Sequence, residues 1–273
     1  MKKSILVPFI ALMTGVSGTA QQRIVSLNGN VSEMLCALGL EQQIAGVDIT
    51  STYPTSLQKK PKVGHNRNIS AEGVLSLQPT LVLGVDNQLN PALVEQLQAV
   101  KVTTRIFKQD LSVQGIRNLL DEVAGATGTS AKATAVRQQF DKEMAAIKTQ
   151  RLDKKVLFIY ARGAGTMMVS GTGTSVDKVL QLAGVQNAVT GFVDFRPLTA
   201  ESLASANPDI ILLFDSGLKS LGGIDGLLQV PGVAQTAAGK NKKVIVMDGE
   251  LLSGFGLRLP QAIRELQEKI HQL

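Results

Sequence analysis

Residues 70–83 read SAEGVLSLQPTLVL, and residues 199–212 read TAESLASANPDIIL, so the same pattern returns 129 positions later. Each copy opens with a hydroxyl residue suited to capping a helix, carries Glu two residues on, and reaches Pro before an apolar run. Because Pro does not continue a helix, each copy predicts a short capped helix followed by a buried strand. Two copies in a chain of 273 residues indicate two similar α/β halves.

Short apolar runs alternate with helix-forming segments on both sides of the repeat. The runs that we expect to form strands span residues 23–27, 44–47, 81–85, 104–107, 156–160, 210–212 and 244–247. Such alternation is typical of parallel sheets covered by helices on both faces. The sequence therefore predicts an α/β protein of two Rossmann-like lobes with parallel sheets.

The segment between the two halves, residues 130–151, reads SAKATAVRQQFDKEMAAIKTQR and contains neither Gly nor Pro. It consists mainly of good helix formers, so we expect a single long α-helix of about 33 Å. This helix joins the lobes. It divides the chain into a lobe at 21–127, a connecting helix at 128–153 and a second lobe at 154–273.

Another helix is expected near the start of the first lobe, from Val31 to Leu38. Asn30 in front of it and Glu33 in its first turn resemble a capping box, in which each side chain bonds to the backbone of the other residue. We therefore expect Glu33 to satisfy the end of this helix.

The first twenty residues have the three parts of a secretory signal peptide. Lys2 and Lys3 provide the positive charge, residues 5–16 are apolar, and residues 18–20 are small enough for cleavage. The apolar part is too short to span a membrane, which takes about 20 residues. The single cysteine, Cys36, excludes an internal disulfide and lies too far from this segment to carry a lipid. We expect the mature chain to be soluble in the periplasm.

Several classes of function lack their residues in this sequence. The strings typical of serine hydrolases, zinc proteases and P-loop nucleotide hydrolases are absent. The two histidines, His65 and His271, lie 206 positions apart, which does not suit a zinc centre. Aromatic residues make up 4% of the chain, and no long cationic run is present, which argues against a nucleic-acid partner. We expect a binding protein rather than an enzyme.

A candidate site precedes the first copy of the repeat. His65 lies on a loop after Gly64, with Arg67 two residues later. The helix expected from Ser70 then places Glu72 in its exposed first turn. A potential ligand, a cation and an exposed carboxylate at a helix end thus lie within eight residues.

The sequence resembles the helical-backbone substrate-binding proteins of bacterial ABC importers, and most closely the periplasmic haem-binding proteins. The likeness extends over nearly all of the mature chain, through the blocks RIVSLNGNVSEMLCALGL, VGHNRNISAEGVLSLQPTLVL, GTGTSVDKVLQLAGVQNAV, RPLTAESLASANPDIILL and LLSGFGLRLPQAI. It implies a monomer that captures haem b between its lobes as a transported ligand, with no catalytic cofactor. The partner it implies is an ABC permease dimer in the inner membrane, with an outer-membrane haem receptor system upstream.

The resemblance also implies an axial ligand for the haem iron. Many members of the family have Tyr where this chain has His65, and the phenolate of that Tyr coordinates ferric haem. Imidazole is also a competent axial ligand, so we expect His65 to bind the iron. The alternative ligands that the sequence leaves open are Tyr53, Tyr160, Met167 and Met168.

Haem carries two propionates, so the resemblance implies cations beside the ligand. Arg67, Arg162 and Arg258 lie in loops that it places at the cleft, and a guanidinium group suits carboxylates. Glu72 and Glu201 occupy matching positions in the two copies of the repeat. In this class of importer such a pair docks onto arginines of the permease.

Two other cargoes remain open for the same class of fold, a ferric siderophore and cobalamin. A single ligating His is compatible with the cobalt of a corrinoid. No motif encodes the haem affinity, the number of haems bound, the preference for ferric or ferrous iron, or a second axial ligand.

Overall fold

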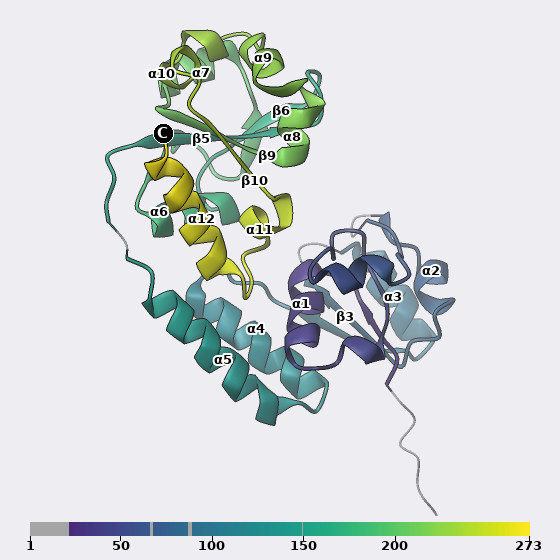
Figure 1. Cartoon of the computed structure of the whole chain (residues 1–273). Helices are drawn as coiled ribbons and strands as arrows, with labels where there is room; N and C mark the ends of the chain where they lie inside the picture. Colours follow the sequence, from purple (N-terminus) through teal and green to yellow (C-terminus); the bar gives the residue numbers. More distant parts are fainter. Residues whose placement is uncertain (1–21, 66–67, 87–88, 149) are drawn as a thin grey trace, which may run out of the picture.

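The computed structural model describes residues 22–65, 68–86, 89–148 and 150–273, and it has two α/β lobes (Figure 1). The first lobe and the helices after it comprise β1 (Ile24–Ser26), α1 (Gly29–Ala37), β2 (Ile44–Val47), α2 (Ala71–Leu75), β3 (Leu81–Val85), α3 (Pro91–Ala99), β4 (Thr103–Phe107), α4 (Val113–Ala126) and α5 (Ser130–Ala145). The second lobe comprises β5 (Lys155–Ala161), β6 (Met167–Ser170), α6 (Ser175–Ala183), β7 (Gln186–Asn187), β8 (Phe195–Pro197), α7 (Ala200–Ala206), β9 (Ile210–Phe214), α8 (Asp215–Ser220), α9 (Gly223–Leu228), α10 (Ala237–Lys240), β10 (Val244–Met247), α11 (Gly249–Gly254) and α12 (Leu259–His271). The expected two-lobed α/β architecture is confirmed.

The sequence repeat forms the same local structure in both lobes. The hydroxyl of Ser70 accepts the backbone N–H of Gly73 at 3.1 Å, which caps α2. The hydroxyl of Thr199 accepts the backbone N–H of Ser202 at 3.0 Å, which caps α7. Each helix is followed by a buried strand, β3 in the first lobe and β9 in the second. The prediction of two capped helix–strand units is therefore confirmed.

The two sheets differ in strand direction. The first sheet has the order β2-β1-β3-β4 and is wholly parallel. The second has the order β10-β9-β5-β6-β8, and its β5–β6 and β6–β8 pairs are antiparallel. The expectation that both sheets are parallel is therefore wrong for strands β6 and β8 of the second sheet. The chain reverses after β5 because Gly163 adopts a φ of +72° and the N–H of Arg162 bonds to the carbonyl of Thr166 at 2.9 Å.

The helix expected between the two lobes is α5, and it is shorter than predicted. Helix α5 begins at Ser130 as expected but ends at Ala145, so its 16 residues span about 24 Å. It packs against α4, to which the ion pairs Arg117–Asp141 and Arg137–Asp121, both at 2.8 Å, attach it. The chain leaves the helix after Ala145, and Ile147 then packs against the core. Tertiary packing thus overrides the helix propensity of this segment. The division at 128–153 stays a prediction.

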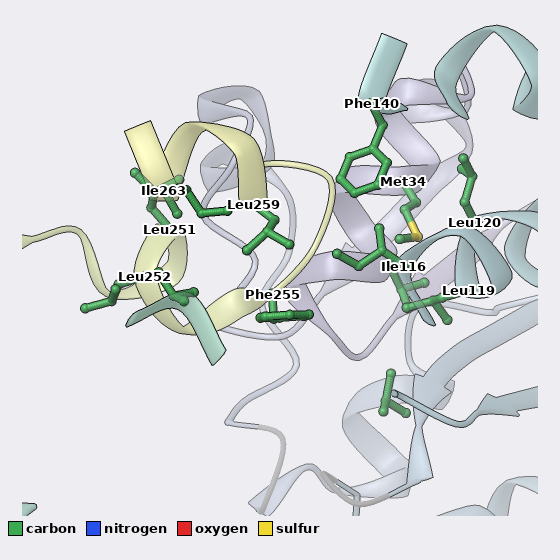
Figure 2. Close-up of a cluster of buried hydrophobic side chains, with 14 of the residues drawn as sticks. Met34, Ile116, Leu119, Leu120, Phe140, Leu251, Leu252, Phe255, Leu259 and Ile263 are labelled. Carbon is green, nitrogen blue, oxygen red and sulfur yellow. The ribbon is translucent and has the colours of Figure 1, made fainter. Parts of the chain in front are cut away.

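One apolar core runs through both lobes. It joins buried residues of α1, α4 and α5 to buried residues of α6, α11 and α12. Figure 2 shows Met34, Ile116 and Phe140 on the first group of helices, with Phe255 and Leu259 of the second group beside them. Phe255 is 3% exposed. Since separating the lobes would expose this shared surface to water, the core restricts their relative movement.

Candidate ligand site at the junction of the two lobes

The two lobes meet where the N-terminus of α1 faces the end of α11 (Figure 1). The amide groups of Asn30 and Gln109 both donate to the carbonyl of Gly254, at 2.5 and 3.2 Å. A Cβ atom at Gly256 would lie 2.4 Å from Oδ1 of Asn30, so this contact requires glycine. We call this region the interlobe junction. It consists of Gly29, Asn30, Glu33, Asp48 and Gln109 from the first lobe and Asp248, Glu250, Gly254, Gly256 and Arg258 from the second.

Arg258 joins the lobes through an ion pair. Its Nε donates to Oε2 of Glu33 at 2.8 Å, and the two side chains are only 18% and 10% exposed. Burial raises the pKa of Glu33, and the charge of Arg258 opposes that shift. The cap of α1 is Asn28, whose side chain accepts the N–H of Val31, so the expected capping box of Asn30 and Glu33 is wrong. Glu33 serves the junction instead of the helix end.

Glu250 is a partly buried acid of the junction, and the buried Glu33 and Asp48 are two other acids of the junction. A Cβ atom at Gly29 would lie 3.0 Å from Oε2 of Glu250, so the carboxyl group reaches the first residue of α1. Burial, the largest cause, and the charges of Asp48, Asp248 and Glu33 together raise the pKa of Glu250 to about 7, against the opposing charge of Arg258. No sequence motif marks these acids, because they come from three separate segments of the chain.

The loop that carries His65 is fixed beside the carboxyl end of β2. The N–H of Ile49 bonds to the carbonyl of Gly64 at 3.0 Å, and the N–H of Val63 bonds to the carbonyl of Val47 at 3.0 Å. Gly64 adopts a φ of +112°, which strongly favours glycine. The His65 side chain is half-buried. Arg67 lies outside the described residues.

Tyr53 follows the same strand and contacts Arg258. The guanidinium carbon of Arg258 lies 4.0 Å from the centre of the Tyr53 ring. Tyr53 is 45% exposed, and Ile49 nearby in the chain is 47% exposed. The structure thus brings two of the sequence-predicted site residues, Tyr53 and Arg258, into contact.

The predicted site residues of the second lobe gather at the β5–β6 hairpin. Tyr160 and Met168 are opposite one another in the antiparallel pair, so they share one face of the sheet. The exposed Arg162 lies 5.5 Å from the centre of the Tyr160 ring. Met167 points to the other face, where it packs against the second core cluster. Of the two methionines, only Met168 therefore shares a face with Tyr160.

The two glutamates of the repeat lie in equivalent and exposed positions. Glu72 is in the first turn of α2, and Glu201 is in the first turn of α7. A carboxylate there is favoured by the helix dipole, which explains each one locally. Their exposure on two lobes leaves both available to a partner.

Two cavities lie away from these residues. One, of about 100 Å³, is near Lys154, Asp209 and Lys243, and the other is a groove of about 560 Å³ between α3 and β4. Neither is lined by a predicted site residue. Within the described ranges, no group of three or more His, Cys, Asp and Glu side chains is placed to hold a metal ion. In the same part of the chain, no helix has the length and apolar character needed to cross a membrane.

Comparison with known proteins gives a match over most of the chain. A protein-family model described as "Periplasmic binding protein" matches residues 24–251. The uncharacterized ABC transporter substrate-binding lipoprotein YvrC of Bacillus subtilis is 26% identical over 257 residues, which cover 92% of this chain and 80% of that protein. The vitamin B12-binding protein of Yersinia pseudotuberculosis is 26% identical over 227 residues, which cover 81% and 78%.

Solved structures with greater identity are named as haem-binding proteins. The apo form of the periplasmic haem-binding protein RhuT from Roseiflexus sp. RS-1 is 37% identical, with a TM-score of 0.88, and the match covers 93% of this chain and 99% of that one. The periplasmic haem-binding protein HutB of Vibrio cholerae is 33% identical, with a TM-score of 0.82, and the match covers 92% and 100%.

Proposed function

The chain belongs to the periplasmic binding protein family, whose members bind substrates for ABC transporters and are not enzymes, and from this premise we propose that it captures haem and delivers it to a permease. The fold of two lobes meeting at the carboxyl ends of parallel strands supports a ligand site there, since open α/β sheets bind ligands at that edge. Identities of 37% and 33% to proteins named as haem-binding support haem as the cargo.

The observation that carries the proposal is the position of His65. Two backbone hydrogen bonds hold its loop beside the carboxyl end of β2. The N–H of Ile49 donates to the carbonyl of Gly64, and the N–H of Val63 donates to the carbonyl of Val47. A loop fixed in this way presents an imidazole at a defined point without a large loss of conformational entropy on binding. Haem iron accepts an imidazole as an axial ligand, so His65 is the proposed iron ligand.

The alternative ligands differ in their surroundings. Tyr53 belongs to the first lobe, as His65 does, and Tyr160 and Met168 would approach from the second lobe. Met167 packs into the second core cluster and is the weakest of the four. A porphyrin between the lobes would also contact the exposed Ile49, which favours an apolar ring.

The proposed partners of the propionates are Arg67, Arg162 and Arg258. Arg162 is exposed, and its guanidinium carbon lies 5.5 Å from the centre of the Tyr160 ring. Arg258 already bonds to Glu33 through Nε. A guanidinium group has five N–H donors, so Arg258 has the capacity to bind a propionate while it holds Glu33.

Delivery requires docking on the permease dimer, for which we propose Glu72 and Glu201. The two carboxylates are exposed and occupy equivalent positions of the two lobes. The permease would release the ligand by moving the lobes apart against the shared core. In this proposal the chain is exported by the signal peptide at 1–20, acts as a soluble periplasmic monomer, and receives haem from an outer-membrane receptor system.

Cobalamin is the second candidate cargo, and a ferric siderophore is the third. The similarity to a vitamin B12-binding protein favours cobalamin, but its identity of 26% is lower than that of the haem-binding structures. His65 would then ligand cobalt instead of iron.

A haemin titration of the mature chain tests the cargo and the ligand together. We expect saturable binding with a histidyl visible spectrum, loss of that spectrum in His65→Ala, and an unchanged spectrum in His271→Ala, whose residue lies exposed at the end of α12. Separate titrations with cyanocobalamin and with a ferric siderophore test the two alternative cargoes. Binding of either without binding of haemin would overturn the proposal, and an unchanged spectrum in His65→Ala would move the ligand to Tyr53, Tyr160 or Met168.

A further inference from the structure

Two neighbouring segments of the first lobe carry proposed contacts to the cargo. One follows the carboxyl end of β2 and contains Tyr53, and the other runs beside that strand end and contains His65. The N–H of Ile49 bonds to the carbonyl of Gly64 at 3.0 Å, which attaches one segment to the other near their start. A group that holds the rest of the first segment would therefore also fix Tyr53 relative to His65.

Buried polar side chains anchor the beginning of the Tyr53 segment. The carboxylate of Asp48, which is fully buried, accepts the hydroxyl of Ser51 at 2.5 Å. The hydroxyl oxygen of Ser51 also lies 2.7 Å from that of Ser32 in α1. Ser51 is thus fixed to both the end of β2 and the helix. These side-chain bonds reach no further along the chain than Ser51, two residues before Tyr53.

Lys62 closes the loop that follows. Its ammonium group donates to the carbonyl of Ser51 at 2.9 Å and to the carbonyl of Leu57 at 3.1 Å. These two carbonyls lie on either side of Tyr53 in the chain. The backbone of Lys62 is itself fixed, since it forms a parallel bridge with Val47 of β2. Because hydrogen bonds from a charged donor are stronger than neutral ones, one side chain holds both ends of the loop that carries Tyr53.

We propose that Lys62 is a positioning residue of the ligand site, which holds Tyr53 and His65 at a fixed separation so that both meet the cargo as one unit. This role rests on the proposed function and deepens it by naming a residue that acts through others. A loop that is ordered before binding loses less conformational entropy when the cargo arrives. Groups that orient metal ligands commonly change the affinity about 10- to 100-fold when they are removed.

The rival role for Lys62 is direct contact with a carboxylate of the cargo. An ammonium group has three N–H donors, and the two carbonyls take two of them, so one donor is left for a propionate. The two roles are separable because only direct contact requires a free carboxylate on the cargo. A positioning role affects every cargo that Tyr53 and His65 contact together, whether or not that cargo is charged.

The test compares two substitutions of Lys62, an exposed residue whose loss leaves the buried core intact. Lys62→Met keeps the aliphatic stem without the donors, and Lys62→Arg restores N–H donors. We expect Lys62→Met to bind haemin about tenfold more weakly, chiefly through faster dissociation, and Lys62→Arg to recover most of the affinity. Haemin dimethyl ester, which has no free carboxylate, should show the same loss. Lys59→Met, at an exposed position two residues after Leu57, should bind haemin as the unaltered chain does.

Amide hydrogen exchange in the empty protein tests the loop without any cargo. The N–H of Leu57 bonds to the carbonyl of Pro54 at 2.9 Å, inside the loop that Lys62 closes. This amide should exchange faster in Lys62→Met because the loop opens more often. It should exchange at the original rate in Lys62→Arg and in Lys59→Met.

Three results would overturn the proposal. Equal exchange of the Leu57 amide in the unaltered chain and in Lys62→Met would show that Lys62 does not hold the loop, whatever the cargo. Faster exchange with unchanged haemin affinity would give Lys62 a role in the fold alone. A loss for haemin but not for its dimethyl ester would make Lys62 a propionate contact. If the unaltered chain binds no haemin, the proposed function fails, and the same variants are compared with whichever of cyanocobalamin and the ferric siderophore it binds.

Discussion

Arg258 of the second lobe donates to Glu33 of the first at 2.8 Å, and its guanidinium carbon lies 4.0 Å from the centre of the Tyr53 ring. These residues come from three different segments of the chain, and the ion pair joins positions 225 residues apart. The pair is largely shielded from water, so its two members depend on one another. Removing one leaves the other as a buried charge without its counter-ion.

Arg258→Ala should therefore lower the free energy of unfolding by about 3 kcal/mol, because Glu33 stays buried without its cation. Urea denaturation measures the loss. The matched control is Arg264→Ala, which removes an exposed pair with Glu143 at 3.5 Å and should cost less than about 1 kcal/mol. If Glu33→Ala costs the same with and without Arg258, the two residues are not coupled, and this explanation is wrong.

The stability of the chain should depend on the ionisation of Glu250. The pKa of Glu250 is about 7 in the folded chain and 4.5 ordinarily, so the folded state binds more protons between these values. Its contribution to stability is complete below pH 4.5 and is lost as pH rises toward 7. We expect a loss of roughly 1–3 kcal/mol between pH 5 and 8 in urea denaturation. Glu250→Gln should flatten this dependence, and an equal slope in both proteins would contradict the assignment.

Phe255→Ala should destabilise both lobes together. The ring is 3% exposed and lies in the core shared by α1, α4 and α12, so its removal leaves a cavity between the lobes. The expected cost is about 3–5 kcal/mol, with one unfolding transition for the whole chain. Val100→Ala, at a position 54% exposed, is the control and should change little. Two separate transitions in the unaltered chain would show that the lobes unfold independently.

Glu72→Lys and Glu201→Lys should weaken binding to the permease without changing haem affinity. Both carboxylates are exposed and lie in short helices of different lobes, so neither contributes to the junction. We expect a loss of about tenfold for each substitution, which corresponds to about 1.4 kcal/mol. Binding to the permease in detergent measures the effect, with Glu268→Lys as the control. Normal binding by the double variant would exclude these residues as the docking pair.

Much of the fold was accessible from the sequence because its signals are local. Ser70 and Thr199 cap helices through residues three positions on, and the apolar runs after Pro79 and Pro208 form strands. The exposure of Glu72 and Glu201 follows from the same local pattern. Each of these predictions depends on a few neighbouring residues, which the chain specifies by itself.

The direction of β6 was not accessible in the same way. The sequence predicts a Gly-rich loop from Arg162 to Thr166. It does not say that the chain turns back there, so that β6 pairs with β5 in the antiparallel direction. The length of α5 is a similar case. It ends at Ala145, and Ile147 then packs against the core, whereas helix propensity alone continues the helix to residue 151.

Local sequence patterns were enough to predict the two α/β lobes and their capped helices. The surroundings of Glu33 and Glu250 became apparent only in the folded chain. Glu33 fits a helix cap by sequence, yet the contact with Arg258 places it in the junction. The charge state of Glu250 depends on burial against Gly29 and on acids from other segments. Burial and charge proximity are properties of the assembled lobes, and no local pattern encodes them.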